Sequence, residues 1–302
     1  MISVIIPVYK NTKIFLTNLR KNLKFLKDCQ IIIVNDDSER SIKSEIKKIK
    51  AKNIILIENK KNLGFGQSVN IGVKYAKGGY LFLLNTDVIL NNKNYLHALK
   101  YFKKNPNLFA VSFAQLEKDN QIVGKSILYF KDGLFCHQKA NNLNFGFNAW
   151  AEGGACLIDK KKFNYLGGFD NLYSPFYWED VDLSYRAWKA GFKILFDPKI
   201  LVEHHHQTTI SKYFDKNEIK TIAYRNQLIF SLKNTTDFDL IAKFIFFFFK
   251  KLIKSIIIVD LIYLKAVITF ILKIPLIIIK KISTIKIYKI KDKKIISFFE
   301  NG

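Results

Sequence analysis

Cysteine, proline and tryptophan are scarce in this chain of 302 residues, which has three Cys, five Pro and three Trp. The cysteines, Cys29, Cys136 and Cys156, are odd in number and have no C-x-x-C spacing. This argues against a disulfide framework and a zinc knuckle, and it favours a reducing compartment. The strand-like residues 2–7 follow Met1 directly, without the charged and apolar regions of a signal peptide, so we expect a cytoplasmic catalytic part.

Acidic residues and long apolar runs are also scarce. The 25 Asp and Glu residues stand against 49 Lys and Arg, which gives a formal net charge of +24 and predicts an anionic partner. The charge alone does not choose between nucleic acid, nucleotide diphosphates and acidic lipid headgroups. No window reaches the roughly 18 uncharged apolar residues of a membrane-spanning helix. The hydrophobic fraction of 49% nevertheless supports a large core.

Strand and helix patterns alternate over the first hundred residues. Apolar runs of strand length lie at residues 2–8, 31–34, 54–57 and 80–84. Helical spacing lies between them, at residues 12–26, 39–49 and 66–75. This βαβ series predicts an α/β fold with a mainly parallel, doubly wound sheet, and ligands are expected beyond the carboxyl ends of its strands. Polar residues occupy those ends, at Tyr9, residues 35–37 and residues 85–87.

The pattern is less regular between residue 108 and residue 150. Residues 109–116 and 122–130 predict two strands, which we expect to extend the sheet in antiparallel fashion. A later helix begins near Asp180 and ends at Gly191, a typical C-cap residue, and two strands are expected after it, near 192–196 and 200–203. We assign residues 1–236 to one catalytic domain.

The composition changes near residue 237, and we assign residues 237–302 to a basic amphipathic helical extension. From position 242 onward, thirteen Lys stand against three carboxylates, a local net charge of +10. Four of these lysines fall within roughly 60° of one another on a continuous helix: Lys243, Lys250, Lys254 and Lys265. A narrow basic stripe opposite a broad apolar surface predicts a helix lying in an anionic membrane interface, and Pro275 is expected to end or kink it. A helix packed on the catalytic domain or on a dimer partner is the alternative.

Three groups of residues have the chemistry of a metal-dependent enzyme. Asn85-Thr86-Asp87 ends a predicted strand, where a carboxylate can coordinate a cation that bridges two phosphates, although a polar turn is the alternative. Glu179, Asp180 and Asp182 place three carboxylates in four positions, and their mutual repulsion is expected to raise at least one pKa, which suits a general base. His204 begins a run of three histidines that offers metal ligands, with a solvated loop as the alternative.

Together these segments resemble a family 2 glycosyltransferase of the GT-A fold, most closely its rhamnosyltransferase-like branch. The matching motifs occur in the family's order: VIIPVY from Val4, VNDDS from Val34, NLGF from Asn62, LNTD from Leu84, GGFD from Gly167 and WEDVDL from Trp178, then Pro198 and His204. The resemblance covers residues 2–233. It implies inverting transfer of a sugar from a UDP- or dTDP-sugar to a hydroxyl of a glycan or lipid-linked acceptor in cell-surface polysaccharide synthesis.

The resemblance also implies which residues bind the donor and the metal. The nucleotide and donor site would comprise Pro7, Tyr9, Asp36, Asn62, Gly64, Asn85 and Thr86. Asp36 would contact the uracil or thymine imide, and Asp87 with His204 would hold Mg²⁺ or Mn²⁺ on the diphosphate. Many relatives have Asp where this chain has Asn85, so the implied metal affinity is weaker and His204 matters more.

Catalysis and sugar binding are implied for a second set of residues. Asp180 would be the catalytic base, and Glu179 and Trp178 would shape the acceptor and donor-sugar site. Gly153 and Gly154 would allow the backbone to approach the sugar closely, with a plain turn as the alternative.

Other classes of protein share parts of this pattern. A nucleotidyltransferase also places nucleotide and metal on a parallel sheet, but no Gly-rich phosphate loop follows the first strand. A nucleic-acid-binding protein would explain the charge, but much of the Lys excess lies in the apolar extension, and we expect no nucleic-acid partner. The set Asp36, Asp87, Asp180 and His204 argues against a pseudoenzyme. We therefore expect an enzyme that lies peripherally on the inner face of the cell membrane.

Overall fold

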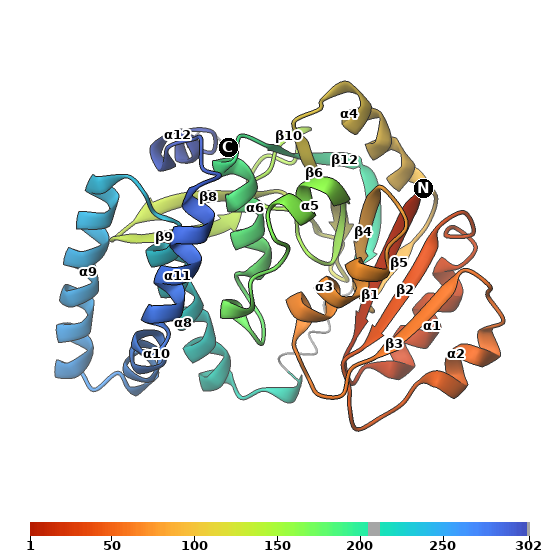
Figure 1. Cartoon of the computed structure of the whole chain (residues 1–302), viewed down its shortest axis with the longest axis horizontal. Helices are drawn as coiled ribbons and strands as arrows, with labels where there is room; N and C mark the ends of the chain where they lie inside the picture. Colours follow the sequence, from red (N-terminus) through yellow and green to blue (C-terminus); the bar gives the residue numbers. More distant parts are fainter. Residues whose placement is uncertain (205–211, 301–302) are drawn as a thin grey trace.

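The computed structural model describes residues 1–204 and 212–300, and a long mixed sheet runs through its centre (Figure 1). The strand order is β10-β12-β6-β11-β4-β1-β2-β3. The half that begins the chain is parallel and comprises β1 (Ile2–Val8), β2 (Gln30–Asn35), β3 (Ile54–Glu58) and β4 (Tyr80–Leu84). The predicted α/β fold with a mainly parallel sheet is confirmed, and the strand order reverses beside β1, where β4 lies on one side and β2 on the other.

The second half of the sheet is built from distant parts of the chain. β11 (Ala155–Asp159) pairs antiparallel with both β4 and β6 (Leu108–Leu116), and β12 (Lys193–His204) runs parallel to β6. Three short strands complete it: β5 (Val88–Leu90), β7 (Ile122–Val123) and β10 (Gly146–Phe147).

Two sequence predictions for this half are wrong. The predicted strand at 122–130 is broken at Gly124, whose φ of +113° suits glycine, and β8 (Ser126–Lys131) pairs with β9 (Leu134–Lys139) in a separate sheet. The two strands predicted at 192–196 and 200–203 form the single strand β12, because a register shift between Asp197 and Leu201 absorbs the irregular residues.

Helices cover both faces of the sheet. They are α1 (Thr12–Asn22), α2 (Lys43–Ile49), α3 (Phe65–Tyr75), α4 (Ala98–Lys104), α5 (Lys160–Tyr165) and α6 (Glu179–Lys189), with single 3₁₀ turns at Asn94–His97 and Asn171–Tyr173. Alternate residues of β1 enter two cores: Ile5 packs with α3, whereas Val4 and Ile6 pack with α1.

The C-terminal helices pack against the catalytic part instead of standing apart. They are α8 (Lys216–Asn234), α9 (Phe238–Ile257), α10 (Leu261–Ile271), α11 (Ile274–Ile285) and α12 (Asp292–Ser297). Tyr263 and Ile277 belong to the same core as Tyr185 of α6. The buried Asp292 carboxylate accepts hydrogen bonds from Lys189 Nζ at 2.8 Å and from the Tyr185 hydroxyl at 2.6 Å. One face of these helices therefore packs on the catalytic domain, which was the alternative to a membrane-bound helix.

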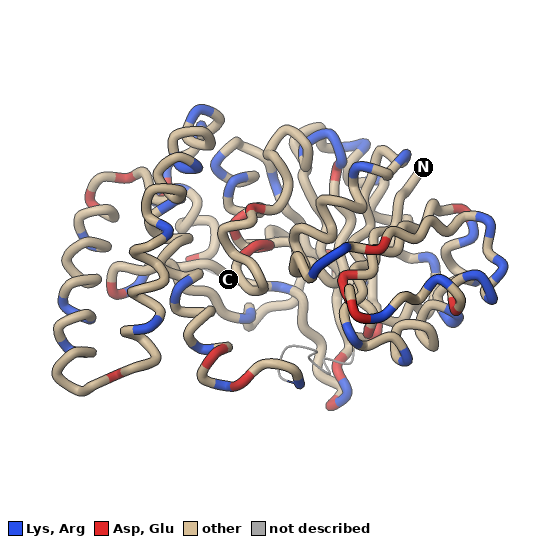
Figure 2. Tube along the Cα trace, turned by 60° about the horizontal axis from the view of Figure 1, so that its bottom comes forward, with Lys and Arg blue, Asp and Glu red and all other residues tan. Residues whose placement is uncertain are grey.

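The opposite face of α9, α10 and α11 is apolar and exposed. Of 27 exposed large hydrophobic residues in the described ranges, 18 lie between Phe238 and Ile285, so this face is the main apolar surface of the molecule. Basic positions recur along these helices (Figure 2). Lys265 lies on α10, beyond the break at Val259, so it does not continue the α9 stripe on one helix as predicted. No single described helix is long and apolar enough to cross a membrane, although α10 and α11, bent by 60°, satisfy that test as a pair.

Candidate active site

A cavity of about 430 Å³ opens where β1, β2 and β4 end, opposite the start of α6. Thirteen of the predicted site residues line it: Pro7, Tyr9, Asp36, Asn62, Gly64, Asn85, Thr86, Asp87, Gly153, Gly154, Glu179, Asp180 and His204. The carboxyl ends of parallel strands and a helix N-terminus thus bring together residues that lie up to about two hundred positions apart in the chain.

Asp87 and His204 meet because β5 pairs with the end of β12. The register places Val88 opposite His204, so Asp87 lies next to the ring, and His204 Nε2 is 3.1 Å from Asp87 Oδ1. The backbone of this segment is fixed from α1, where Asn18 donates to the Thr86 carbonyl at 3.0 Å and Asn22 donates to the Val88 carbonyl at 2.9 Å. The pair therefore has a rigid support.

Asp36 holds the loop that contains Asn62 and Gly64. Its carboxylate accepts the backbone N–H groups of Leu63 at 2.9 Å and Gly64 at 2.8 Å, and the Asn59 amide at 2.8 Å. Burial raises the pKa of Asp36 in spite of these hydrogen bonds. Gly64 has a φ of +82°, and a Cβ there would lie 2.7 Å from the Pro175 carbonyl oxygen. Asp36 thus shapes the wall of the cavity as well as lining it.

Two of the three clustered carboxylates have a raised pKa. Burial raises the pKa of Asp180 to about 6, and the Glu152 charge adds to the effect. Burial, together with the charge of Asp180, raises the pKa of Glu179 well above its usual range, and its buried Oε2 atom makes no hydrogen bond within the described residues. The raised pKa agrees with the prediction, but burial is its first cause in both groups, and repulsion within the cluster comes second only for Glu179, because the charge that acts on Asp180 is that of Glu152.

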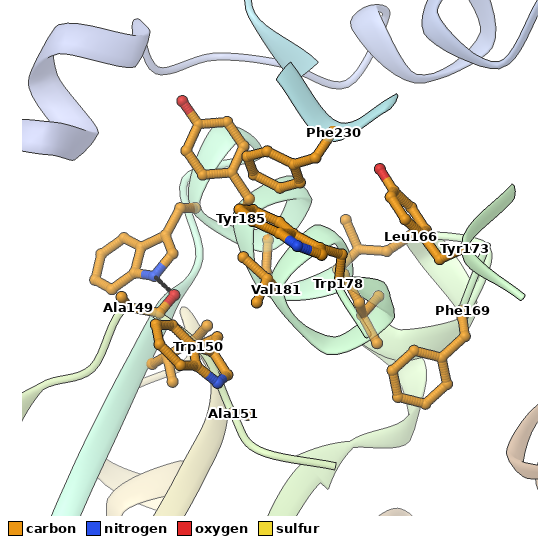
Figure 3. Packing of buried hydrophobic residues seen from close by; sticks show 14 of the residues in the cluster. Ala149, Trp150, Ala151, Leu166, Phe169, Tyr173, Trp178, Val181, Tyr185 and Phe230 are labelled. Carbon is orange, nitrogen blue, oxygen red and sulfur yellow. Dashed lines mark hydrogen bonds between the residues drawn. The ribbon is translucent and has the colours of Figure 1, made fainter. Parts of the chain in front are cut away.

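Trp178 does not line the cavity, contrary to the prediction. It is 7% exposed, and its ring packs against Phe230 at 4.9 Å and His137 at 5.0 Å between centroids. Figure 3 shows Trp178 beside Tyr185 and Phe230 in the core. The residue has a φ of +75°, and this left-handed turn points the large ring inward while the next two residues face the cavity.

Several lining residues were not identified from the sequence as site residues. They are Val8, Trp150, Glu152, Pro175, Phe176, Tyr177 and Phe214. Glu152 was detectable as a carboxylate directly before Gly153-Gly154, and Phe176 and Tyr177 directly precede the acidic cluster. Phe214 follows the histidine run in the sequence, and none of its neighbouring residues indicates a binding site.

Gln115 is a buried polar residue that was also not predicted as a site residue. It is 0% exposed on β6, its amide donates to Glu152 Oε2, and its carbonyl oxygen contacts His204 Nδ1. A polar side chain next to the last residue of a mainly apolar strand was the available signal. Glu152 and His204 are thereby joined through one amide.

The described residues contain no group of three or more His, Cys, Asp or Glu side chains that could hold a metal. Asp87 and His204 offer one oxygen and one nitrogen, so any ion there would need ligands from a bound molecule as well. The predicted ligands of the histidine run beyond His204, namely His205 and His206, lie outside the described residues.

The fold is of the GT-A type. Solved structures of that kind share the fold. GalNAc-T7 with UDP, GalNAc and Mn²⁺ aligns with a TM-score of 0.60 and 15% identity, covering 76% of this chain and 47% of that one. Staphylococcus aureus TarS 1-349 in complex with UDP-GlcNAc aligns with a TM-score of 0.51 and 17% identity, covering 82% and 72%.

The family model described as "Glycosyl transferase family 2" matches residues 3–163, more than half of the 302 residues, and the chain belongs to this family. It is 27% identical over 172 residues to a poly-beta-1,6-N-acetyl-D-glucosamine synthase of Staphylococcus aureus (strain COL), covering 56% of this chain and 41% of the relative. It is 26% identical over 223 residues to an uncharacterized glycosyltransferase of Rickettsia felis, covering 72% and 36%. The chain therefore spans less than half of either relative. The prediction of a glycosyltransferase is confirmed.

Proposed function

We propose that this family 2 glycosyltransferase moves a sugar from a UDP- or dTDP-sugar to a hydroxyl of a glycan or lipid-linked acceptor in cell-surface polysaccharide synthesis. The observation that carries this proposal is that the Asp87–His204 pair and Asp180 line one cavity. Structural relatives crystallised with UDP-GlcNAc, and with GDP-Man and Mn²⁺, support a nucleotide-sugar donor. The sequence motifs favour the rhamnosyltransferase-like branch, which would make the donor a hexose or deoxyhexose.

Asp87 Oδ1 and His204 Nε2 suit one divalent cation. Their separation of 3.1 Å is close to the roughly 3 Å between adjacent ligands that each lie about 2.1 Å from an octahedral ion. Mg²⁺ prefers oxygen ligands throughout, so the imidazole favours Mn²⁺ of the two. Such an ion, when bound, stabilises the charge that develops on a departing nucleotide diphosphate.

Asp180 acts as the base in this proposal. Its Oδ2 accepts the Gly153 N–H at 3.4 Å and its Oδ1 accepts the Val181 N–H at 2.8 Å, so the carboxylate is oriented by backbone on both sides. It takes the proton of the acceptor hydroxyl as the new C–O bond forms on the face opposite the leaving group, which inverts the anomeric configuration. Glu179 lies next to it, and burial together with the charge of Asp180 raises the pKa of Glu179 well above its usual range.

The test is a panel of UDP-, dTDP- and GDP-sugars, scored by release of the nucleoside diphosphate with Mn²⁺, Mg²⁺ or EDTA. We expect turnover of a UDP- or dTDP-sugar with Mn²⁺ and loss of turnover in EDTA. Turnover that persists in EDTA would remove Asp87 and His204 from their proposed roles. Turnover of GDP-sugars alone would refute the proposed nucleotide.

We further propose that residues 237–302 hold the catalytic domain, residues 1–236, on the anionic inner surface of the cell membrane. The exposed apolar face of α9, α10 and α11, interleaved with Lys residues, supports this, because ammonium groups bind anionic headgroups while the apolar face enters the acyl boundary. Sedimentation with vesicles of phosphatidylcholine, with and without phosphatidylglycerol, tests it.

Binding should require phosphatidylglycerol and should weaken as salt is added. The double variant Phe246→Ser/Phe249→Ser, changed at two exposed α9 positions, should bind less, whereas Lys47→Gln/Lys48→Gln on α2 serves as a control. Dimers in solution without vesicle binding would instead assign this face to a second copy of the chain.

A further inference from the structure

Glu152, Gln115 and His204 form one continuous line of contacts that ends at Asp87. Gln115 Nε2 lies 2.5 Å from Glu152 Oε2, Gln115 Oε1 contacts His204 Nδ1, and His204 Nε2 lies 3.1 Å from Asp87 Oδ1. Gln115 is 0% exposed and His204 is 3% exposed. Contacts with protein groups, and not with bulk water, therefore determine which atoms of these two side chains donate and which accept.

The charge of Glu152 decides how the Gln115 amide is oriented. An ionised carboxylate only accepts hydrogen bonds, so the amide must present its NH₂ group to Glu152. The Gln115 carbonyl oxygen then faces His204 and can only accept, which requires a proton on His204 Nδ1. In a neutral imidazole the lone pair therefore lies on Nε2, the atom that faces Asp87.

We propose that Glu152 and Gln115 are positioning residues that fix the Nδ1–H tautomer of His204 and so prepare Nε2 to bind a cation beside Asp87. Metal-binding histidines generally use such partners on the second ring nitrogen. The inference rests on the metal site of the proposed function. The opposite tautomer would place an Nε2–H group against the Asp87 carboxylate, and the pair would then be closed to a cation.

The tautomer can be read directly, without activity and without metal. ¹⁵N-labelled histidine NMR of the metal-free full chain, at a pH where the ring is neutral, distinguishes Nδ1–H from Nε2–H, and His204→Gln assigns the signal. We expect Nδ1–H in the wild type. In Glu152→Gln the side chains at positions 115 and 152 are both amides, so no carboxylate fixes the orientation of the Gln115 amide. The population of the Nε2–H tautomer should then increase, because Nε2–H donates to the Asp87 carboxylate. An Nε2–H wild type would overturn the proposal.

Mn²⁺ binding in the presence of UDP, followed by EPR of the free ion, provides the second measurement. Glu152→Gln should bind Mn²⁺ about tenfold more weakly, in line with the usual effect of losing a partner of a metal ligand. The exchange variant Gln115→Glu/Glu152→Gln should recover most of the affinity, because the carboxylate introduced at position 115 accepts from Nδ1–H while the amide introduced at position 152 donates to that carboxylate. Glu117→Gln, a carboxylate just beyond β6, is the matched control and should bind as the wild type does.

Equal tautomer populations and equal Mn²⁺ affinities in Glu152→Gln and the wild type would overturn the proposal. If the wild type has the Nδ1–H tautomer but does not bind Mn²⁺, the metal site of the proposed function is refuted. The proposed role of Glu152 and Gln115 in preparing that site is then refuted as well. Circular dichroism of each variant shows whether a loss of affinity comes from unfolding.

Discussion

Asp180 and Asp182 lie two residues apart on α6 and have opposite electrostatic surroundings. Burial, reinforced by Glu152, raises the pKa of Asp180 to about 6, and its carboxylate lines the cavity. Burial also acts on Asp182, but the charges of Arg186 and Lys233 outweigh it and hold the pKa of that carboxyl below its usual range. One end of the helix thus carries a titratable carboxylate towards the cavity and a permanent anion towards the core.

Replacing Asp180 by Asn should remove the base while keeping the shape of the side chain. We expect turnover to fall by about 10²- to 10⁴-fold, the usual contribution of a general base, with UDP affinity nearly unchanged. Steady-state rates and calorimetric titration with UDP measure the two quantities. Asp28→Asn, an exposed carboxylate remote from the cavity, is the control. A normal rate in Asp180→Asn would end its assignment as the base.

The pH dependence of turnover should report the raised pKa of Asp180. Because the ionised form is the base, kcat/KM should rise with pH up to about 6 and then level off. The same raised pKa lowers the stability of the folded state progressively as pH rises from about 4 to about 6, and fully above pH 6, since the carboxyl ionises more easily in the unfolded chain. Asp180→Asn should therefore be more stable than the wild type at pH 7.5, by up to about 3 kcal/mol in urea unfolding. A lower stability there would contradict the origin of the shift.

Gly154 has no room for a side chain, because a Cβ would lie 2.6 Å from Asn85 Nδ2 and 3.1 Å from His204 Cε1. Gly154→Ala should displace the side chains of Asn85 and His204. We expect kcat/KM to fall by about 10- to 100-fold, since small displacements of positioned catalytic groups slow the reaction strongly. Gly79→Ala is the matched control, because a Cβ there meets nothing within 4 Å. Similar rates for the two variants would show that the cavity tolerates movement at this point.

The first half of the fold and most of the cavity could be predicted because local patterns carry them. Asp36 follows β2 and Asp87 follows β4, both in the parallel half of the sheet, and the carboxyl ends of parallel strands meet at one edge whatever the rest of the chain does. Gln115 could not be assigned a partner, because its neighbours Glu152 and His204 arrive through the pairing of β6 with β11 and β12. Trp178 was misplaced because its inward direction depends on a left-handed turn that neither hydrophobicity nor spacing reveals.

Helices beyond the boundary predicted at residue 236 share a core with the catalytic part, and Asp292 gives the most direct test of that packing. Asp292 is 0% exposed and binds Lys189, which is also 0% exposed, together with the backbone N–H groups of Thr236 and Asp237. Removing one charge of a buried pair leaves the other uncompensated, so Asp292→Asn should lower the free energy of unfolding by about 3 to 5 kcal/mol. Asp239→Asn, whose pairing with Lys293 is solvent-exposed, should change it little.

A chain truncated after Thr236 should lose still more than Asp292→Asn. It would remove the Asp292 carboxylate that pairs with Lys189 and accepts the Tyr185 hydroxyl, together with Tyr263 and Ile277 from the shared core. We expect it to aggregate or to lack a cooperative unfolding transition, as judged by size-exclusion chromatography and circular dichroism. A truncated chain that stays monomeric, unfolds cooperatively and keeps its UDP affinity would show that the helices after position 236 are an accessory. They would then serve the membrane surface alone and add nothing to the stability of the catalytic core.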